Sequence, residues 1–149
     1  MYPRWHVLLG AIFTVILWVV FPHISLLNLS LVFLASFLID FDHYMNAVWK
    51  GGSFSLFKSF EYYKKVEKRI ESENKKGVRN RSDFQIFHTF EFHILVLMFG
   101  FFWSGFFFIF IGMAFHSLLD IFGLAYRDRL YIREYFFAAW LTRKINEKR

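Results

Sequence analysis

Two long stretches of this chain carry no charged side chain, and they constrain its fold more than any other feature. Residues 5–39 and 92–119 contain no Asp, Glu, Lys or Arg. Each is longer than the ~20 apolar residues that cross a bilayer core once. Each also has a turn signal near its middle, at Pro22-His23 and at Trp103-Ser104-Gly105. The pattern therefore predicts two crossings per stretch, with transmembrane helices at about 5–21, 25–40, 83–102 and 105–124.

The composition agrees with a membrane protein. The chain has 149 residues, enough for one domain, and 56% of them are hydrophobic, including 23 Phe. A soluble domain of this size could not bury so much apolar surface. We therefore expect an all-α fold, a single membrane domain over residues 1–149 built as an integral membrane bundle.

The positive charges are all expected on one side of the membrane. An even number of crossings places both termini and the segment 44–82 on the same side, and all 18 Lys and Arg then lie there. The two opposite turns carry none. The positive-inside rule makes the charged side cytoplasmic, which predicts a multi-pass protein of the inner (cytoplasmic) cell membrane. The same rule accounts for the net charge of +6, so nucleic acid is not expected as a partner.

Two cytoplasmic segments are predicted to lie on the membrane surface. In the basic segment 44–82, apolar residues recur at helical spacing at Phe57, Phe60, Tyr63, Val66 and Ile70, with lysines on the other face. Such a helix lies on the inner leaflet, attracted by the lipid bilayer and its anionic lipid headgroups. The alternative is an ordinary solvated linker helix. The segment 130–149 includes an amphipathic stretch too short to span, and it predicts a short interfacial C-terminal helix.

Ionisable residues near membrane helices are costly, so they are candidates for function. Here they lie at the cytoplasmic ends of all four predicted helices, so the topology brings imidazoles and carboxylates to one depth on one side. They are His6, Asp40, Asp42, His43, His88, Glu91, His93, His116 and Asp120.

The spacing and chemistry of these residues predict a metal site. His116 and Asp120 share a helix face at i,i+4, and His88 and Glu91 are neighbours at i,i+3. Imidazole with carboxylate suits a divalent metal, with zinc first and manganese or iron as alternatives, and the absence of Cys excludes thiolate ligands. The predicted ligands are His6, Asp42, His43, His88, His116 and Asp120. Glu91 or Asp40 is the expected catalytic base.

The order of these motifs resembles the membrane-bound, predicted metal-dependent hydrolases of bacteria and archaea, which include the LexA-binding, inner-membrane-associated hydrolases. The matching elements are His6-Val-Leu-Leu-Gly10, Asp40-Phe-Asp42-His43, His88-Thr-Phe-Glu-Phe-His93 and His116-Ser-Leu-Leu-Asp120. The resemblance covers roughly residues 5–124 and implies a metal-dependent hydrolase of unspecified substrate. The sequence departs from the family's His-Arg-Gly-x-Thr-His element at Thr89, Phe90 and Phe92, which makes Glu91 an alternative to His93 as ligand or base.

The predicted function is a membrane-embedded metallohydrolase whose site opens to the cytoplasmic interface, with a phospholipid or another ester or phosphoester amphiphile as substrate. One alternative is a non-enzymatic metal-stabilised scaffold or a small cation carrier. A second is a di-iron oxygenase, although such enzymes need about eight His and this chain has six. In a third, the His and Asp residues serve only hydrogen bonds between helices.

Overall fold

The chain is helical throughout its regular structure. The computed structural model describes residues 3–147, and no strand occurs within them. The predicted all-α class is therefore confirmed. Residues 1–2 of the predicted domain and 148–149 of the predicted C-terminal segment lie outside the described range. In chain order the elements are α1 (Pro3–Val20), α2 (Leu26–Leu38), α3 (Phe41–Gly51), α4 (Leu56–Lys75), the short 3-10 helix η1 (Ile86–His88), α5 (Phe90–Phe99), α6 (Gly105–Tyr126), η2 (Leu130–Ile132) and α7 (Phe137–Asn146).

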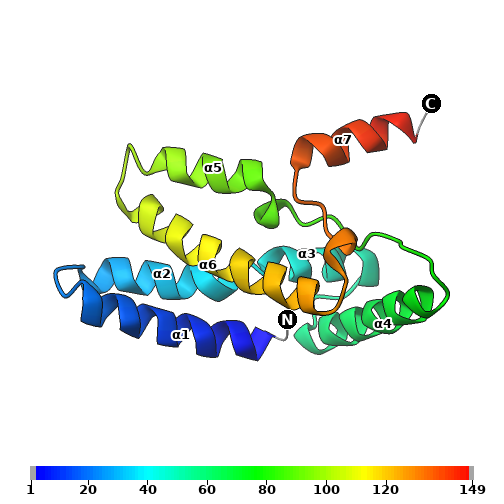
Figure 1. Cartoon of the computed structure of the whole chain (residues 1–149), viewed down its shortest axis with the longest axis horizontal. Helices are drawn as coiled ribbons and strands as arrows, with labels where there is room; N and C mark the ends of the chain where they lie inside the picture. Colours follow the sequence, from blue (N-terminus) through cyan, green and yellow to red (C-terminus); the bar gives the residue numbers. More distant parts are fainter. Residues whose placement is uncertain (1–2, 148–149) are drawn as a thin grey trace.

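Four helices form the body of the molecule. The helix α2 packs against both α1 and α6, and α5 packs against α6. Figure 1 shows the α1–α2 and α5–α6 turns at one end of this body, at the left, whereas α3, α4 and α7 extend from the other end. The charged segments thus gather at a single end, as the sequence predicts.

Two glycines allow α2 to approach its neighbours closely. A Cβ at Gly112 would lie 2.3 Å from the carbonyl oxygen of Val32 and 2.9 Å from the Cβ of Ala35. A Cβ at Gly10 would lie 2.0 Å from the Oγ of Ser36. Small residues at such crossings let backbones pack tightly where no hydrophobic effect drives helices together. This packing holds α6 at a fixed height beside α2, which matters because both helices lead into the site described below.

Within residues 3–147, two helical segments are long and apolar enough to cross a membrane. They are Leu26–Gly51, which runs through α2 and α3, and Gly105–Tyr126. Arg4–Val20 and Phe90–Phe99 are apolar but shorter. At 1.5 Å per residue, the ten residues of α5 span about 15 Å, half of the ~30 Å hydrocarbon core. The structure therefore supports membrane association through two candidate spans, and the four-crossing bundle stays a prediction.

Large apolar side chains cover much of the outer surface. The exposed fraction reaches 72% at Val19, 73% at Leu26 and 91% at Phe101. A monomer in water rarely exposes a continuous apolar surface of this kind. A lipid environment removes the penalty, so the outward pattern agrees with the apolar composition of the helices.

The predicted helix at 83–102 begins later than its composition suggests. The α-helix starts at Phe90, and its N-cap is Thr89, whose hydroxyl accepts a hydrogen bond from the N–H of Phe92. The predicted start at about residue 83 is wrong, because residues 78–85 form no helix and the Ser82 N–H donates to the carbonyl of Ile132. Tertiary contacts thus hold the residues before η1 extended and set the depth at which His88 lies.

The charged segments contain more helix than the sequence indicates. The helix α3 is not predicted as a separate element, and it ends at Gly51, followed by Gly52, whose φ of 64° is the left-handed conformation that glycine adopts easily. The predicted amphipathic helix is α4. Its apolar face is divided: Val66 and Ile70 are buried within the protein, whereas Phe57 and Phe60 are exposed.

Candidate metal centre

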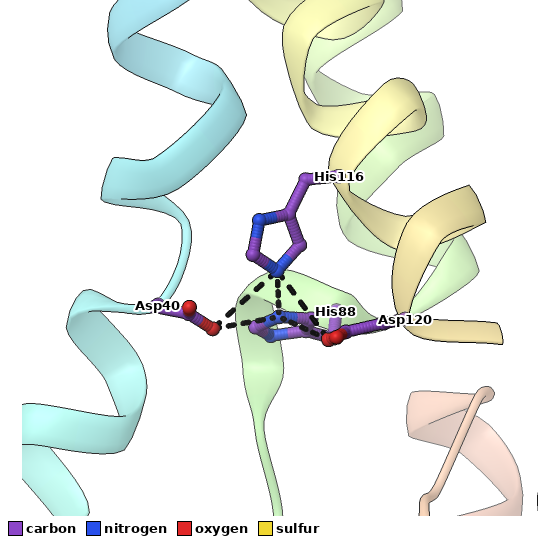
Figure 2. A group of neighbouring side chains, drawn as sticks. All are labelled: Asp40, His88, His116 and Asp120. Atoms are coloured by element: carbon purple, nitrogen blue, oxygen red, sulfur yellow. Dashed lines mark hydrogen bonds and ion pairs between the residues drawn. The ribbon is translucent and has the colours of Figure 1, made fainter. Parts of the chain in front are cut away.

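Three separate parts of the chain bring imidazoles and carboxylates to one point. Asp40 lies in the turn between α2 and α3, His88 ends η1, and His116 and Asp120 lie one turn apart on α6. Figure 2 shows these four side chains, here called the metal group, pointing toward one another. His88, His116 and Asp120 are buried, and Asp40 is partly exposed. The predicted convergence of His88, His116, Asp120 and Asp40 is therefore present.

The distances within the metal group fit a small divalent ion. The Nε2 atoms of His88 and His116 are 3.2 Å apart. From the Nε2 of His116, Oδ1 of Asp40 and Oδ2 of Asp120 are each 3.4 Å away, and from the Nε2 of His88 they are 3.5 and 3.8 Å away. Ligands at 2.0–2.1 Å around tetrahedral zinc lie about 3.3 Å from one another. Five of the six distances among the four atoms are thus 3.2–3.8 Å, and all six are within 4.8 Å, so the four atoms are close enough together to surround one ion.

Neighbouring groups orient both imidazoles toward the centre. Nδ1 of His116 lies 2.8 Å from the carbonyl oxygen of Ser36, and Nδ1 of His88 lies 3.1 Å from Oδ2 of Asp42. Each oxygen accepts a hydrogen bond from Nδ1–H, which leaves the Nε2 lone pair free to bind a metal. The same Oδ2 of Asp42 also accepts from the N–H of Phe87. In this arrangement Asp42, predicted as a ligand, orients the ligand His88.

His6 lies against the metal group from α1. Its ring stacks on His116 with centroids 3.9 Å apart, and its side chain is 1% exposed. Its Nε2 is 3.2 Å from Oδ1 of Asp120, yet neither ring nitrogen makes a hydrogen bond within residues 3–147. A buried imidazole without hydrogen bonds is costly. This position fits the prediction that His6 belongs to the site.

A second group of possible ligands overlaps the first. Atoms of Asp42, His43 and His88 also lie within 4.8 Å of one another. Nε2 of His43 is 3.3 Å from Oδ1 of Asp40, and its Nδ1 is 3.3 Å from Nε2 of Gln85. Because His88 belongs to both groups, the structure allows one ion with Asp42 and His43 around it, or two adjacent ions.

Glu91 does not belong to either group. Its two carboxylate oxygens accept hydrogen bonds from the N–H groups of Phe137 (2.9 Å) and Ala138 (3.1 Å), at the start of α7. A carboxylate there is favoured by the unpaired N–H groups of the helix terminus. The prediction of Glu91 as ligand or base therefore does not agree with its position, because helix α5 begins at Phe90 and directs this side chain to α7.

His93 is a buried, hydrogen-bonded residue between α5 and α6. Its Nδ1 lies 2.9 Å from the carbonyl oxygen of Thr89, and its Nε2 lies 3.1 Å from the Oγ of Ser117. Both ring nitrogens therefore have partners away from the metal group. Of the two histidines in the His-x4-His element, the structure brings His88 alone to the centre.

Sequence reasoning missed one residue that touches the metal group. Nη1 of Arg133 lies 2.8 Å from Oδ2 of Asp120, and the Arg133 side chain is 10% exposed. In the sequence Arg133 is one of many basic residues outside the apolar stretches. The apolar run Leu130-Tyr131-Ile132 before it was the one weak sign that this arginine is held inside the fold.

A cavity of about 1080 Å³ reaches the metal group from the end of the molecule that carries α3 and α4. It lies between α4, the last turns of α6 and the chain around η2. Asp40, His43 and Asp120 all line it, so a molecule in the cavity would contact the same carboxylates and imidazoles.

Comparisons with known proteins found no match for this chain. No protein-family model matches it, and neither a curated protein nor a solved structure is significantly similar to it.

Proposed function

We propose that this chain crosses the inner cell membrane four times, with α3, α4, α7 and both termini on the cytoplasmic side. Two segments meet the length and apolarity of a span. The other two crossings, α1 and α5, pack beside them, and the intervening turns at the far end carry no Lys or Arg. The basic residues at the opposite end support the cytoplasmic assignment.

At that face the protein is a metal-dependent hydrolase that cleaves an ester or phosphoester bond of an amphiphile, with a phospholipid as the leading candidate. The observation that carries this proposal is the convergence of four ligand atoms, all within 4.8 Å of one another, beside a large cavity. Catalytic metal sites differ from structural ones in keeping a position open to water and substrate. Here the cavity offers that access.

The residues divide into three roles. His88, His116 and Asp120 hold the ion, with His6 against Asp120, and Asp42 orients His88. Asp40, whose side chain is 20% exposed and lines the cavity, accepts the proton of the attacking water. A divalent ion in such a site lowers the pKa of a coordinated water and polarises the scissile carbonyl or phosphoryl oxygen.

The donor set favours zinc, and manganese or iron remain alternatives. All three ions accept two imidazoles with one or two carboxylates, and a site of three or four such ligands is most typical of zinc. The resemblance to membrane-bound metal-dependent hydrolases agrees with this reaction class. It adds no substrate, and it stays a prediction.

The function is tested with the full chain reconstituted into phosphatidylethanolamine–phosphatidylglycerol vesicles and supplied with zinc, manganese or iron(II). We expect metal-dependent release of a lipid fragment, detected by mass spectrometry, that His116→Ala abolishes. His23→Ala, which removes a histidine from the opposite turn, serves as the matched control and retains activity. A folded, metal-loaded protein that hydrolyses no lipid ester, phosphoester or peptide contradicts the proposal.

A closed, non-enzymatic metal site is the second candidate. It is favoured by the position of Asp40, whose Oδ1 is as near the two Nε2 atoms as Oδ2 of Asp120 is. If Asp40 binds as fourth ligand, no position is left for water, as in structural zinc sites. Manganese-loaded protein distinguishes the two, because an exchangeable water on the ion accelerates solvent proton relaxation and a closed site does not.

A further inference from the structure

The cavity beside the metal group has a size suited to an amphiphile. Its volume of about 1080 Å³ exceeds the upper end of the ~300–1000 Å³ typical of small-molecule pockets. It runs from Asp40 and Asp120 to the outer turns of α4 and α6. A headgroup alone would fill only part of it.

The charge of the cavity favours an anion once the metal group holds a cation. Asp40 and Asp120 are then compensated by the ion, and Glu67 is the remaining acidic residue of the wall. Glu67 pairs with Arg127 at 3.5 Å. The other basic residues that line the cavity are Lys64, Arg129 and Arg133.

Arg133 is the basic group placed to hold an anion at the reacting centre. It contacts Oδ2 of Asp120 at 2.8 Å with a side chain that is 10% exposed, so its guanidinium is fixed beside the metal group. A guanidinium has five N–H donors in a rigid fork that matches phosphate oxygens. One donor to Asp120 leaves others for a ligand in the cavity that Arg133 lines.

The outer part of the cavity has an apolar wall that opens toward lipid. Leu56 and Phe60 of α4 and Phe122 of α6 line it, with exposed fractions of 65%, 61% and 65%. Val66 and Ile70 continue this wall inward and are buried. A hydrocarbon chain between α4 and α6 would cover these side chains.

We propose that the cavity binds one phosphate-bearing lipid, with its phosphate held by Arg133 next to the metal group and an acyl chain lying between α4 and the last turns of α6. This inference rests on the proposed function, and it names the substrate class and assigns Arg133 as the residue that positions it. A neutral lipid lacks the phosphate, and a soluble phosphate ester lacks the chain, so each would use only half of the cavity.

Gly123 provides a way to fill the cavity without disturbing the metal group. It lines the cavity on α6, and a Cβ built there meets no atom within 4 Å. Gly123→Trp therefore occupies the chain-binding space without a backbone conflict. Gly51→Trp is the matched control, because Gly51 also has open space around it and lies outside the cavity lining.

The test measures binding of three hydrolysis-resistant probes to the full chain in detergent by microscale thermophoresis. The first is a dioleyl diether lipid with a phosphonate headgroup, the second is the same diether glycerol without the phosphonate, and the third is inorganic phosphate. For the wild type we expect the phosphonate lipid to bind at least about tenfold more tightly than either other probe, since each missing part removes the equivalent of a strong contact.

The variants then assign each part of the ligand. Arg133→Gln is expected to weaken binding of the phosphonate lipid about tenfold and leave the diether glycerol unchanged. Arg79→Gln removes the same charge from a residue outside the cavity lining and is expected to change neither. Gly123→Trp is expected to weaken both lipids, and Gly51→Trp neither. If Arg133→Gln fails to fold, the comparison of Gly123→Trp with Gly51→Trp and the comparison of the three probes still decide the proposal.

The inference is overturned if the diether glycerol binds as tightly as the phosphonate lipid, if inorganic phosphate does so, or if the cavity variants behave as their controls. Metal content and lipid hydrolysis are measured on the same preparations. Selective lipid binding without hydrolysis would overturn the proposed function and leave this inference standing. Metal-dependent hydrolysis combined with lipid binding that neither Arg133→Gln nor Gly123→Trp weakens would overturn this inference and leave the proposed function standing.

Discussion

Two regions at the end of the molecule that carries α3 and α4 bring polar and charged side chains together from distant parts of the chain, and they differ in how hydrogen-bond donors and acceptors are arranged. In the metal group, Oδ1 of Asp40, Oδ2 of Asp120 and the Nε2 atoms of His88 and His116 converge. In the second region, here called the Asp83 cluster, Oδ1 of Asp83 is 2.5 Å from the Nζ of Lys50 and Oδ2 is 2.8 Å from the hydroxyl of Tyr62.

The two regions differ in whether each hydrogen-bond acceptor faces a donor of the protein. In the Asp83 cluster each carboxylate oxygen faces an N–H or O–H donor, so the cluster is satisfied by the protein itself. In the metal group the Nδ1–H groups of both imidazoles are used outside the centre, so their Nε2 atoms and the carboxylate oxygens of Asp40 and Asp120 face one another, with Arg133 as a donor to Asp120 from the side. Facing acceptors repel, so a positive charge between them, on a metal ion or on a protonated imidazole, stabilises the group. Burial and charge alone do not distinguish a site from a structural ion pair, whereas the direction of the donors does.

The largest expected effect is the loss of metal when an imidazole of the metal group is removed. Purified wild-type protein is expected to contain about one divalent ion per chain, and His116→Ala close to none, because the site loses one of the three side chains proposed to hold the ion. Inductively coupled plasma mass spectrometry measures this. His23→Ala is the control and retains the ion. Metal-free, well-folded wild-type protein that was never exposed to chelator would remove the basis of the comparison.

A smaller effect is expected from the residue that orients His88. Asp42→Asn keeps the ligands and changes the partner of Nδ1, so metal affinity should fall about 10–100-fold without disappearing. Competition with a chromophoric chelator measures the affinity. An unchanged affinity would mean that Asp42 has no part in the site. A loss as complete as that of His116→Ala would mean that it is a ligand.

A substitution in the Asp83 cluster should lower the stability of the protein and leave its metal content unchanged. Asp83→Ala removes the partner of Lys50 and Tyr62 and is expected to lower the free energy of unfolding by about 1–3 kcal/mol while metal content stays the same. The penalty stays moderate because the Lys50 side chain is 47% exposed and remains hydrated. Thermal unfolding in detergent measures it. Loss of metal in this variant would show that the two regions are not independent.

The smallest expected effect is on the pH dependence of the stability that the Asp83 cluster provides. Burial and the hydrogen bond to Asp83 raise the pKa of Tyr62 from its ordinary 10 to about 12. A raised pKa means that the folded protein favours the protonated phenol, so this stabilisation is complete below about pH 10 and is lost as the pH rises toward 12. Tyr62→Phe should therefore flatten the fall of the unfolding temperature above pH 10. Equal slopes for both proteins would contradict the assignment.

The sequence predicted the helical class and most of the metal group for the same reason. Apolar runs of bilayer length and their turn signals are local properties, and they place His116, Asp120 and Asp40 at helix ends before any packing is known. Side chains at the same end of neighbouring helices come together whatever the detailed geometry.

Local signals failed where long-range contacts decide. Glu91 and His88 are at helical spacing, and the sequence placed them on one face of one helix. Contacts to α3 and η2 hold the chain extended up to η1, and helix α5 begins only after Thr89. The two side chains therefore diverge, with His88 toward the metal group and Glu91 toward α7.

The sequence by itself determined that this protein is helical, that its charges gather at one end and which residue types meet there, because hydrophobic length and charge patterning act through neighbouring residues. The tertiary structure alone decided which carboxylates face the centre, that Arg133 contacts Asp120, and that a cavity separates α4 from α6. These depend on how distant segments pack, and a hydrogen bond formed across 80 residues, such as that between His116 and Ser36, leaves no trace in the local pattern.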